Sequence, residues 1–295
     1  MKIGSNKIRD IIRFFRDELK ELYDEDELNS IISYCFEVYL NINRSQLVLK
    51  SDDTVSESEL LKFNFAVKEL KKHKPIQYIL GRADFYRLPV FVNEYVLIPR
   101  PETEELVDLI IKDVKSSIAN KGNTAVSILD IGTGSGCIPI ALKKNLPMAN
   151  VTAIDVSKDA LDVAEKNSIL NDTAVRFFYA DILSPNQELM DSEYDIIVSN
   201  PPYIGVSEKH TISANVLEYE PHLALFVSSN DPLLFYRKIC DFALQKLKKG
   251  GRIYFEINQL YGQETKELLE NKGFKNVILI KDLNDNNRIL HGNII

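Results

Sequence analysis

From residue 126 to the end of the chain, short apolar runs alternate with segments of helical spacing. This alternation restricts the possible folds more than any other feature. The runs lie near residues 126–131, 151–155, 175–180, 194–199, 251–257, 276–281 and 288–294. Apolar runs of this length between helical segments are typical of a parallel sheet covered on both faces. We therefore predict an α/β fold with a doubly wound sheet.

The first quarter of the chain has a different pattern. Apolar residues recur at helical spacing from Ile8 to Leu22 and again from Leu28 to Val38. Such spacing predicts amphipathic helices with one buried face. Residues 1–75 are therefore predicted to form a small all-α domain of about four helices.

The next segment, residues 76–100, is rich in aromatic and β-branched residues. This composition predicts a short β-hairpin that links two domains. Pro101 then opens a helical pattern, since proline suits the first turn of a helix. Residues 101–295 are left for the α/β domain.

A cluster of basic residues ends the helical region: Lys68, Lys71, Lys72 and Lys74. Two interpretations stay open for this cluster. It is either a solvated helix face or a contact surface for RNA or an acidic partner.

Composition excludes several classes of protein. The 295 residues carry a net charge of −7, and 45% of them are hydrophobic, which is enough for one large core and a smaller domain. Non-specific duplex binding uses a basic surface, so we expect no stable nucleic-acid partner. No apolar run approaches the roughly 20 residues of a membrane span, so we expect no membrane partner. The four histidines have no metal-ligand spacing, and no metal is predicted.

The cysteines indicate the compartment. Cys35, Cys137 and Cys240 are odd in number and far apart in the sequence. They form no disulfide framework, which is typical of a reducing environment. We expect a cytoplasmic protein, and we expect it to be a monomer.

A glycine-rich turn follows the first predicted strand of the α/β domain. Residues 132–136 read Gly-Thr-Gly-Ser-Gly and lead into a helical segment that begins at Cys137. Strand, glycine turn and helix form the layout of a nucleotide-binding unit, but neither the dinucleotide fingerprint nor the P-loop pattern is met. Asp130, just before the turn, would repel a pyrophosphate and suits a cationic or amino-bearing ligand. S-adenosylmethionine has both a sulfonium and an ammonium group.

Two further carboxylates end the next two strands. Asp155 suits both hydroxyls of a ribose, as acids at this position do in dinucleotide folds. Asp181 suits the exocyclic amine of an adenine, and Ile182 suits its ring. The alternative for Asp155 is that it only caps the helix starting near Ser157.

The fourth strand ends in Asn200-Pro201-Pro202-Tyr203, which predicts a stiff corner. Proline fixes φ and has no N–H, and ligands of open α/β sheets bind at the carboxyl ends of strands. The Asn200 Oδ1 and the Pro201 carbonyl suit the two N–H bonds of a planar amide or amine, and Tyr203 suits its face. The alternative is an ordinary proline-rich loop.

These two motifs together resemble the amino-methyltransferases that act on planar nitrogens, which include adenine-N6 and glutamine-N5 methyltransferases. Residues 75–81, 85–90, 97–104 and 219–225 narrow the resemblance. They are similar to the peptide chain release factor glutamine N5-methyltransferase family, the HemK type. The segment Ile-Pro-Arg-Pro-Glu-Thr at 98–103 is the most specific of them.

The resemblance implies a doubly wound, Rossmann-like class I methyltransferase sheet and a helical domain that recognises the substrate. It implies methyl transfer from S-adenosylmethionine to the glutamine of a Gly-Gly-Gln loop on class 1 release factors. The implied catalytic residues are Asn200, Pro201, Pro202 and Tyr203. Cofactor binding is expected from Asp130, Gly132, Thr133, Gly134, Ser135, Gly136, Asp155, Asp181, Ile182 and Asn200. Substrate binding is expected from the four catalytic residues with Phe85, Arg100 and Glu102.

The chain departs from the family pattern in two places. Residues 226–229 read Phe-Val-Ser-Ser where the family often has a Gly-Gly turn, and Asn258 stands where it often has Gly. We expect both to lie in peripheral loops. The alternative functions are an adenine-N6 DNA or RNA methyltransferase, which would flip its base into the same pocket, and a non-catalytic scaffold.

Overall fold

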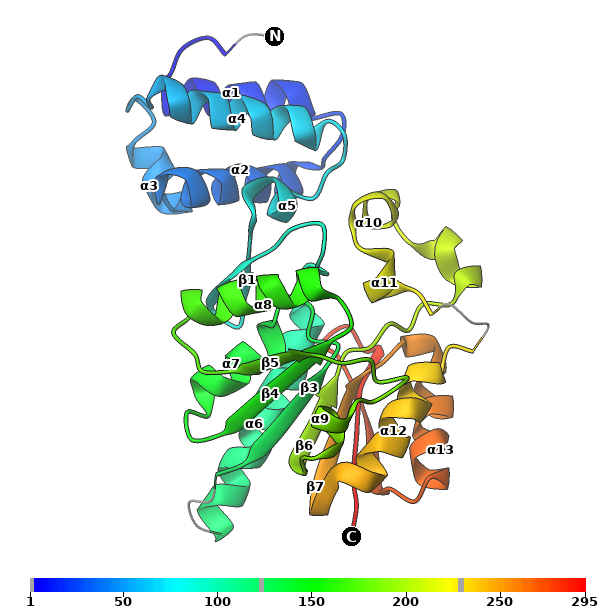
Figure 1. Ribbon diagram of the computed structural model, residues 1–295. Coiled ribbons are helices and arrows are strands. Elements are labelled where there is room, and N and C mark those ends of the chain that lie inside the picture. The colour runs from blue at the N-terminus through cyan, green and yellow to red at the C-terminus, as the bar shows by residue number, and fades with distance from the viewer. Residues whose placement is uncertain (1–2, 122–124, 228–230) are drawn as a thin grey trace. The chain divides into compact units, whose positions relative to one another are not determined.

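The computed structural model describes residues 3–121, 125–227 and 231–295. The chain divides into two compact units, one ending at Arg82 and one beginning at Ala83. Figure 1 shows the first unit as helical and the second as a sheet covered by helices.

From residue 3 on, where its description begins, the first unit contains five helices. They are α1 (Ile8–Leu19), α2 (Glu25–Leu40), α3 (Arg44–Leu49), α4 (Glu57–Leu70) and α5 (Ile76–Leu80). Polar side chains begin three of them: Asp24 caps α2, while Asn43 and Ser56 form capping boxes at α3 and α4. The apolar faces that the sequence predicted enclose one core, which includes Phe15, Phe36 and Phe63.

The second unit is built on a seven-stranded sheet. Its strands are β3 (Ser127–Ile131), β4 (Asn150–Asp155), β5 (Arg176–Tyr179), β6 (Tyr194–Ser199), β7 (Leu247–Glu256), β8 (Lys275–Lys281) and β9 (Asn287–Asn293). The order across the sheet is β5-β4-β3-β6-β7-β9-β8, and only the pairs made by β9 are antiparallel. The predicted doubly wound sheet is therefore confirmed, with all seven strands within a few residues of their expected positions.

Helices cover both faces of this sheet. They are α6 (Pro101–Lys121), α7 (Cys137–Asn145), α8 (Lys158–Leu170), α12 (Leu234–Lys246) and α13 (Gly262–Asn271). The connections contain the short helices α9 (Gln187–Met190), α10 (Ala214–Tyr219) and α11 (His222–Leu225) and the 3₁₀ turns η1 (Val206–Thr211) and η2 (Gln259–Tyr261), and Figure 1 shows α10 and α11 beyond the edge of the sheet. Helix α7 packs on both α6 and α8, whereas α12 packs on α13. Figure 1 shows these two groups on opposite sides of the sheet.

A two-stranded hairpin, β1 (Arg82–Phe85) and β2 (Leu88–Phe91), precedes the sheet. It occupies the middle of the segment where a hairpin was expected, while residues 76–80 form α5 instead. The side chain of Asn167 on α8 bonds both the N–H and the carbonyl of Phe91. This hairpin is therefore fixed to the unit that contains the sheet.

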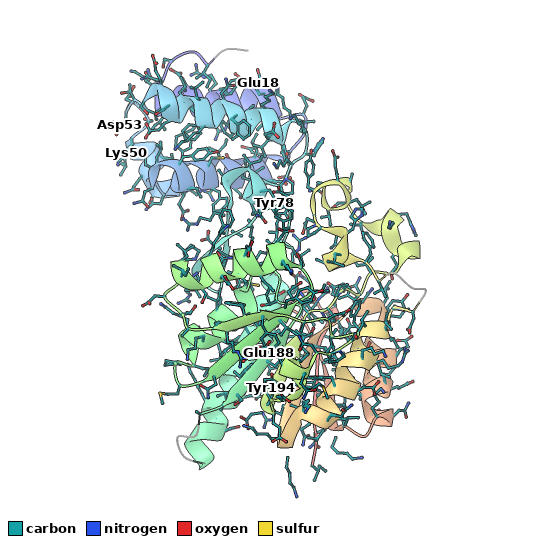
Figure 2. All side chains as sticks on the ribbon, viewed as in Figure 1. Glu18, Lys50, Asp53, Tyr78, Glu188 and Tyr194 are labelled. Atoms are coloured by element: carbon teal, nitrogen blue, oxygen red, sulfur yellow. The ribbon has the colours of Figure 1, made fainter. Side chains whose placement is uncertain are left out.

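Strand β6 passes through the centre of this unit. It begins at Tyr194, which is labelled in Figure 2 and is buried against the core of β-strands and α12. Its carboxyl end at Ser199 leads directly into the Asn-Pro-Pro-Tyr corner. Among the described residues, no helix is long and apolar enough to cross a membrane.

Candidate active site

A cavity of about 310 Å³ opens at the carboxyl ends of β3, β4, β5 and β6. The sheet order reverses beside β3, and ligands of open α/β sheets bind at this point. The lining residues come from the segments 94–103, 131–138, 154–160, 180–182, 199–202 and 221–224, with Phe235 and Ile239 of α12. The loops that the sequence singled out thus meet at one cavity.

The glycines of the turn after β3 have two different roles. Gly132 and Gly134 line the cavity at φ values of 75° and 53°, and a Cβ on either would meet no described atom within 4 Å. Gly136 also has a positive φ, but a Cβ there would lie 2.9 Å from the Cβ of Ala164 on α8. The first two therefore leave room for a ligand at the backbone, whereas Gly136 allows α7 and α8 to pack closely.

Asp155 holds the glycine turn in place. Its Oδ2 accepts a hydrogen bond of 2.8 Å from the Gly134 N–H, and its Oδ1 accepts one of 2.9 Å from the Ser157 N–H. The helix α8 has its own cap, because the Ser157 hydroxyl accepts from Ala160. Asp155 also lines the cavity. It is therefore more than a helix cap, and carboxylate lone pairs that face the cavity suit ribose hydroxyls.

Asp130 is buried beneath the turn. Within the described part of the chain, neither of its carboxylate oxygens nor the hydroxyl of the buried Thr133 has a well-aligned hydrogen-bond partner. Burial, with a smaller contribution from the nearby Asp155, raises the pKa of Asp130 to about 7, although the neighbouring Thr133 hydroxyl acts to lower it. Buried polar groups without partners are rare in proteins. These atoms fit a site that is completed by a ligand with hydrogen-bond donors.

The loop after β5 supplies the third carboxylate. Asp181 and Ile182 both line the cavity, and Asp181 Oδ1 accepts from the Leu183 N–H at 2.8 Å. An amino-bearing aromatic ring suits this combination of an acceptor and a buried apolar side chain. The glycine turn, Asp155 and this loop therefore fit the amino acid, ribose and adenine parts of S-adenosylmethionine.

The Asn-Pro-Pro-Tyr corner faces the same cavity. Asn200, Pro201 and Pro202 line it, and the buried Ser199 donates a hydrogen bond of 2.7 Å to the Ile131 carbonyl. This bond ties the end of β6 to the end of β3. The corner and the glycine turn are therefore fixed relative to each other.

The segment with the Ile-Pro-Arg-Pro-Glu-Thr motif forms another wall. Arg100 Nη2 lies 2.5 Å from Oε1 of Glu220, whose side chain is 1% exposed, and the Ile98 N–H donates to Glu220 Oε2. The cavity lining includes Arg100 and Thr103 from this segment and Pro221, next to Glu220. Glu220 thus joins the two segments that carry much of the family resemblance.

Some expected site residues lie outside the cavity lining. These include Asp130, Gly136 and the α6 residue Glu102. Phe85 is 1% exposed within β1. Tyr203 packs on the core beside Glu256 and does not line the cavity.

Sequence reasoning missed several residues of the site. Ser199, Thr103 and Leu223 line the cavity, and Glu220 supports it. Glu220 lies in the 219–225 segment that resembles the family, but nothing in the sequence indicates that it forms a buried ion pair. Ser199 was hidden because its bond to Ile131 joins strands far apart in the chain.

The expectation that Asn258 lies in a peripheral loop is wrong. Asn258 is 7% exposed, and its Nδ2 donates to the Tyr203 carbonyl at 3.3 Å. In residues 226–229, the other segment that departs from the family pattern, Val227 is buried, and Ser228 and Ser229 lie outside the described residues.

The fold, the glycine turn and the corner after β6 define a class I methyltransferase. Residues 108–221 match the family model of the methyltransferase small domain, and residues 10–81 match that of the PrmC N-terminal domain. A methyltransferase from Pyrococcus furiosus has a similar fold, with a TM-score of 0.50 and 17% identity, over 81% of this chain and 98% of that chain.

Curated relatives identify the family. A release factor glutamine methyltransferase of Flavobacterium psychrophilum is 50% identical over 95% of this chain and 96% of its own length. One of Bacteroides thetaiotaomicron is 41% identical over 96% of this chain and 99% of its own length. The chain belongs to the release factor glutamine methyltransferase family, and it is a methyltransferase. The resemblance of its motifs to this family is therefore confirmed.

Proposed function

We propose that the protein methylates the side-chain N5 of the glutamine in the Gly-Gly-Gln loop of class 1 release factors, with S-adenosylmethionine as the methyl donor. The observation that carries this proposal is the cavity shared by two sets of residues. Gly132, Gly134 and Asp155 occupy one part of its lining, and Asn200 and Pro201 occupy another. A donor and an acceptor that bind to these two parts lie next to each other.

The acceptor nitrogen needs activation, because the lone pair of an amide is delocalised into its carbonyl. Bound S-adenosylmethionine supplies an electrophilic methyl group on a positively charged sulfur. We assign Asn200 Oδ1 and the Pro201 carbonyl as acceptors for the two N–H bonds of the glutamine amide. They would stabilise positive charge that develops on nitrogen as its bond to the methyl carbon forms and the methyl–sulfur bond breaks, with the neutral thioether S-adenosylhomocysteine as the leaving group. The nitrogen then loses one proton to water, because the alkylated amide cation is a strong acid.

The remaining site residues have supporting roles in this proposal. Asp155 binds the ribose, Asp181 and Ile182 bind the adenine, and the buried Asp130 supports the turn. Thr133, Ser135 and Gly136 complete that turn. Pro202 lines the acceptor pocket and Tyr203 supports it from the core, while Phe85, Arg100 and the α6 residue Glu102 are assigned to substrate binding. Each assignment is a target for substitution.

The helical unit, assigned to residues 1–75 with a linker over 76–100, is proposed to recognise the release factor. Helix α4 has two exposed apolar side chains one turn apart, Leu61 at 67% and Phe65 at 53%. Contiguous exposed apolar patches mark protein-binding surfaces, and this pair lies on one face of α4. The neighbouring lysines are weaker evidence for a binding surface, because the charges of Lys71 and Lys72 are already paired with Glu18 and Glu69.

We also propose that the protein acts as a monomer in the cytoplasm. All three cysteines are free. Burial raises the pKa of the Cys137 thiol to about 12, so this cavity-lining thiol is no nucleophile.

The test is transfer of labelled methyl from S-adenosylmethionine to a purified class 1 release factor, with adenine-containing DNA and RNA in parallel. Label on the release factor alone supports the proposal. Label on nucleic acid alone refutes it and favours the adenine-N6 class.

A further inference from the structure

Tyr203, the last residue of the Asn-Pro-Pro-Tyr corner, is held at two points by residues from the carboxyl end of β7. Its hydroxyl lies 3.4 Å from Oε1 of Glu256, the last residue of that strand. Its carbonyl accepts a hydrogen bond of 3.3 Å from Asn258 Nδ2. Both contacts are long for hydrogen bonds, and hydrogen bonds in ligand-free sites often tighten when the substrate binds.

Glu256 is itself fixed in position. Its side chain is buried, and Oε2 accepts a hydrogen bond of 2.6 Å from the hydroxyl of Thr103, which lines the cavity. Its backbone carbonyl lies 3.3 Å from the hydroxyl of the fully buried Tyr236. Burial raises the pKa of Glu256, while the Thr103 hydroxyl and the positive charge of Arg288 act to lower it. One buried carboxylate thus connects the wall that contains Thr103 with the phenol of Tyr203.

Asn258 fixes the segment that follows the corner. Its Nδ2 also donates to Glu208 Oε2 at 3.1 Å, and its Oδ1 accepts from the Leu260 N–H at 3.0 Å. Glu208 in turn accepts from the Gly205 N–H, two residues after Tyr203. The Asn258 amide group therefore donates hydrogen bonds to the loop after the corner and accepts one from η2.

We propose that Glu256 and Asn258 are positioning residues for the methyl acceptor. By fixing Tyr203 at its hydroxyl and its carbonyl, they set where Asn200 and Pro201 present their oxygens in the cavity. The inference rests on the proposed function for the identity of the acceptor. The control of this loop by the end of β7 holds whatever the methyl acceptor is.

The physical reason is the geometry of methyl transfer. A displacement of about 1 Å at a reacting centre can cost about 10²-fold in rate. Two prolines stiffen residues 201 and 202, so a shift of Tyr203 is passed to Asn200 rather than absorbed between them. Apart from Asn200, the residues expected to bind the cofactor lie at the ends of β3, β4 and β5, and these segments make none of the contacts described for Tyr203.

The test uses four variants. Asn258→Asp has the same shape but places an acceptor against the Tyr203 carbonyl and the Glu208 carboxylate. Asn150→Asp is its matched control, because Asn150 is exposed at the opposite, amino end of β4. Thr103→Val removes the hydroxyl that binds Glu256, and Thr103→Ser retains it.

Three quantities are measured for each variant: kcat and KM with the release factor, the Kd for S-adenosylmethionine by calorimetry, and hydrogen exchange of the amides in residues 203–212. We expect Asn258→Asp and Thr103→Val to lower kcat/KM by about 10-fold or more. The cofactor Kd should stay within about twofold for both, and Asn258→Asp should exchange faster in 203–212. Asn150→Asp should behave as the wild type does, and Thr103→Ser should recover most of the kcat/KM that Thr103→Val loses.

Unchanged kcat/KM, or a loss matched by weaker cofactor binding, overturns the inference. Unchanged hydrogen exchange in Asn258→Asp also overturns it, even in an experiment where the wild type labels no release factor. If the wild type binds the cofactor but labels no release factor, only the proposed substrate is refuted.

Discussion

Gly134 and Gly136, in the turn after β3, have different surroundings, and this difference leads to a quantitative prediction. Gly134 and Gly136 both have positive φ, so replacement of either by alanine costs roughly 1–2 kcal/mol of backbone strain. Only at Gly136 does the new methyl group meet other atoms, at 2.9 Å from the Ala164 Cβ and 3.1 Å from the Ile140 Cδ1. Overpacking of this kind costs a further 1–3 kcal/mol, roughly. We therefore expect Gly136→Ala to be the more destabilising variant.

Thermal unfolding measures this difference. One kcal/mol shifts the melting temperature of a domain of 150–250 residues by about 2–4 °C, so Gly136→Ala should melt about 2–12 °C below Gly134→Ala. Calorimetry should give the opposite order for the cofactor. Gly134→Ala places its methyl group at the cavity wall and should weaken S-adenosylmethionine binding, whereas folded Gly136→Ala should bind it well. Equal melting temperatures, or equal affinities, would refute the two roles assigned to these glycines.

Three further predictions concern single features. Arg100→Ala leaves the buried Glu220 carboxylate without its cation and should cost about 3 kcal/mol by denaturant unfolding, and adding Glu220→Gln should recover part of that loss. Since the pKa of Asp130 is raised to about 7 from an ordinary 3.8, the folded state retains a proton that the unfolded state loses; stability should therefore fall as pH rises from 4 to 7, and less steeply in Asp130→Asn. Leu61→Ser with Phe65→Ser should raise KM for the release factor and leave the cofactor Kd unchanged; an unchanged KM would exclude this face of α4 from recognition.

The sheet was predictable because its strands carry local signals. The inner parallel strands β3, β4 and β6 are largely buried, so they read as apolar runs, and glycine, proline or acidic residues mark their ends. The cavity followed from the same logic, since carboxyl ends of parallel strands meet at one edge. Asp155 and Asn200 therefore reached the cavity as expected.

The contacts that support the site were not predictable. The ion pair between Arg100 and Glu220 joins residues 120 positions apart, and the bond between Thr103 and Glu256 joins residues 153 apart. No periodicity or spacing reports such pairs. Asn258 was misplaced for the same reason, because its burial depends on a loop that lies 50 or more positions earlier in the sequence.

The most direct test of the central claim is to locate the methyl group by tandem mass spectrometry after reaction with a class 1 release factor. The wild-type protein should add one methyl to the side-chain amide of the glutamine in the Gly-Gly-Gln loop, and a Gln→Ala release factor should receive none. Asn200→Ala should bind S-adenosylmethionine normally and lose on the order of 10²-fold or more in rate. A methyl on any other residue, or full activity in Asn200→Ala, would contradict the account.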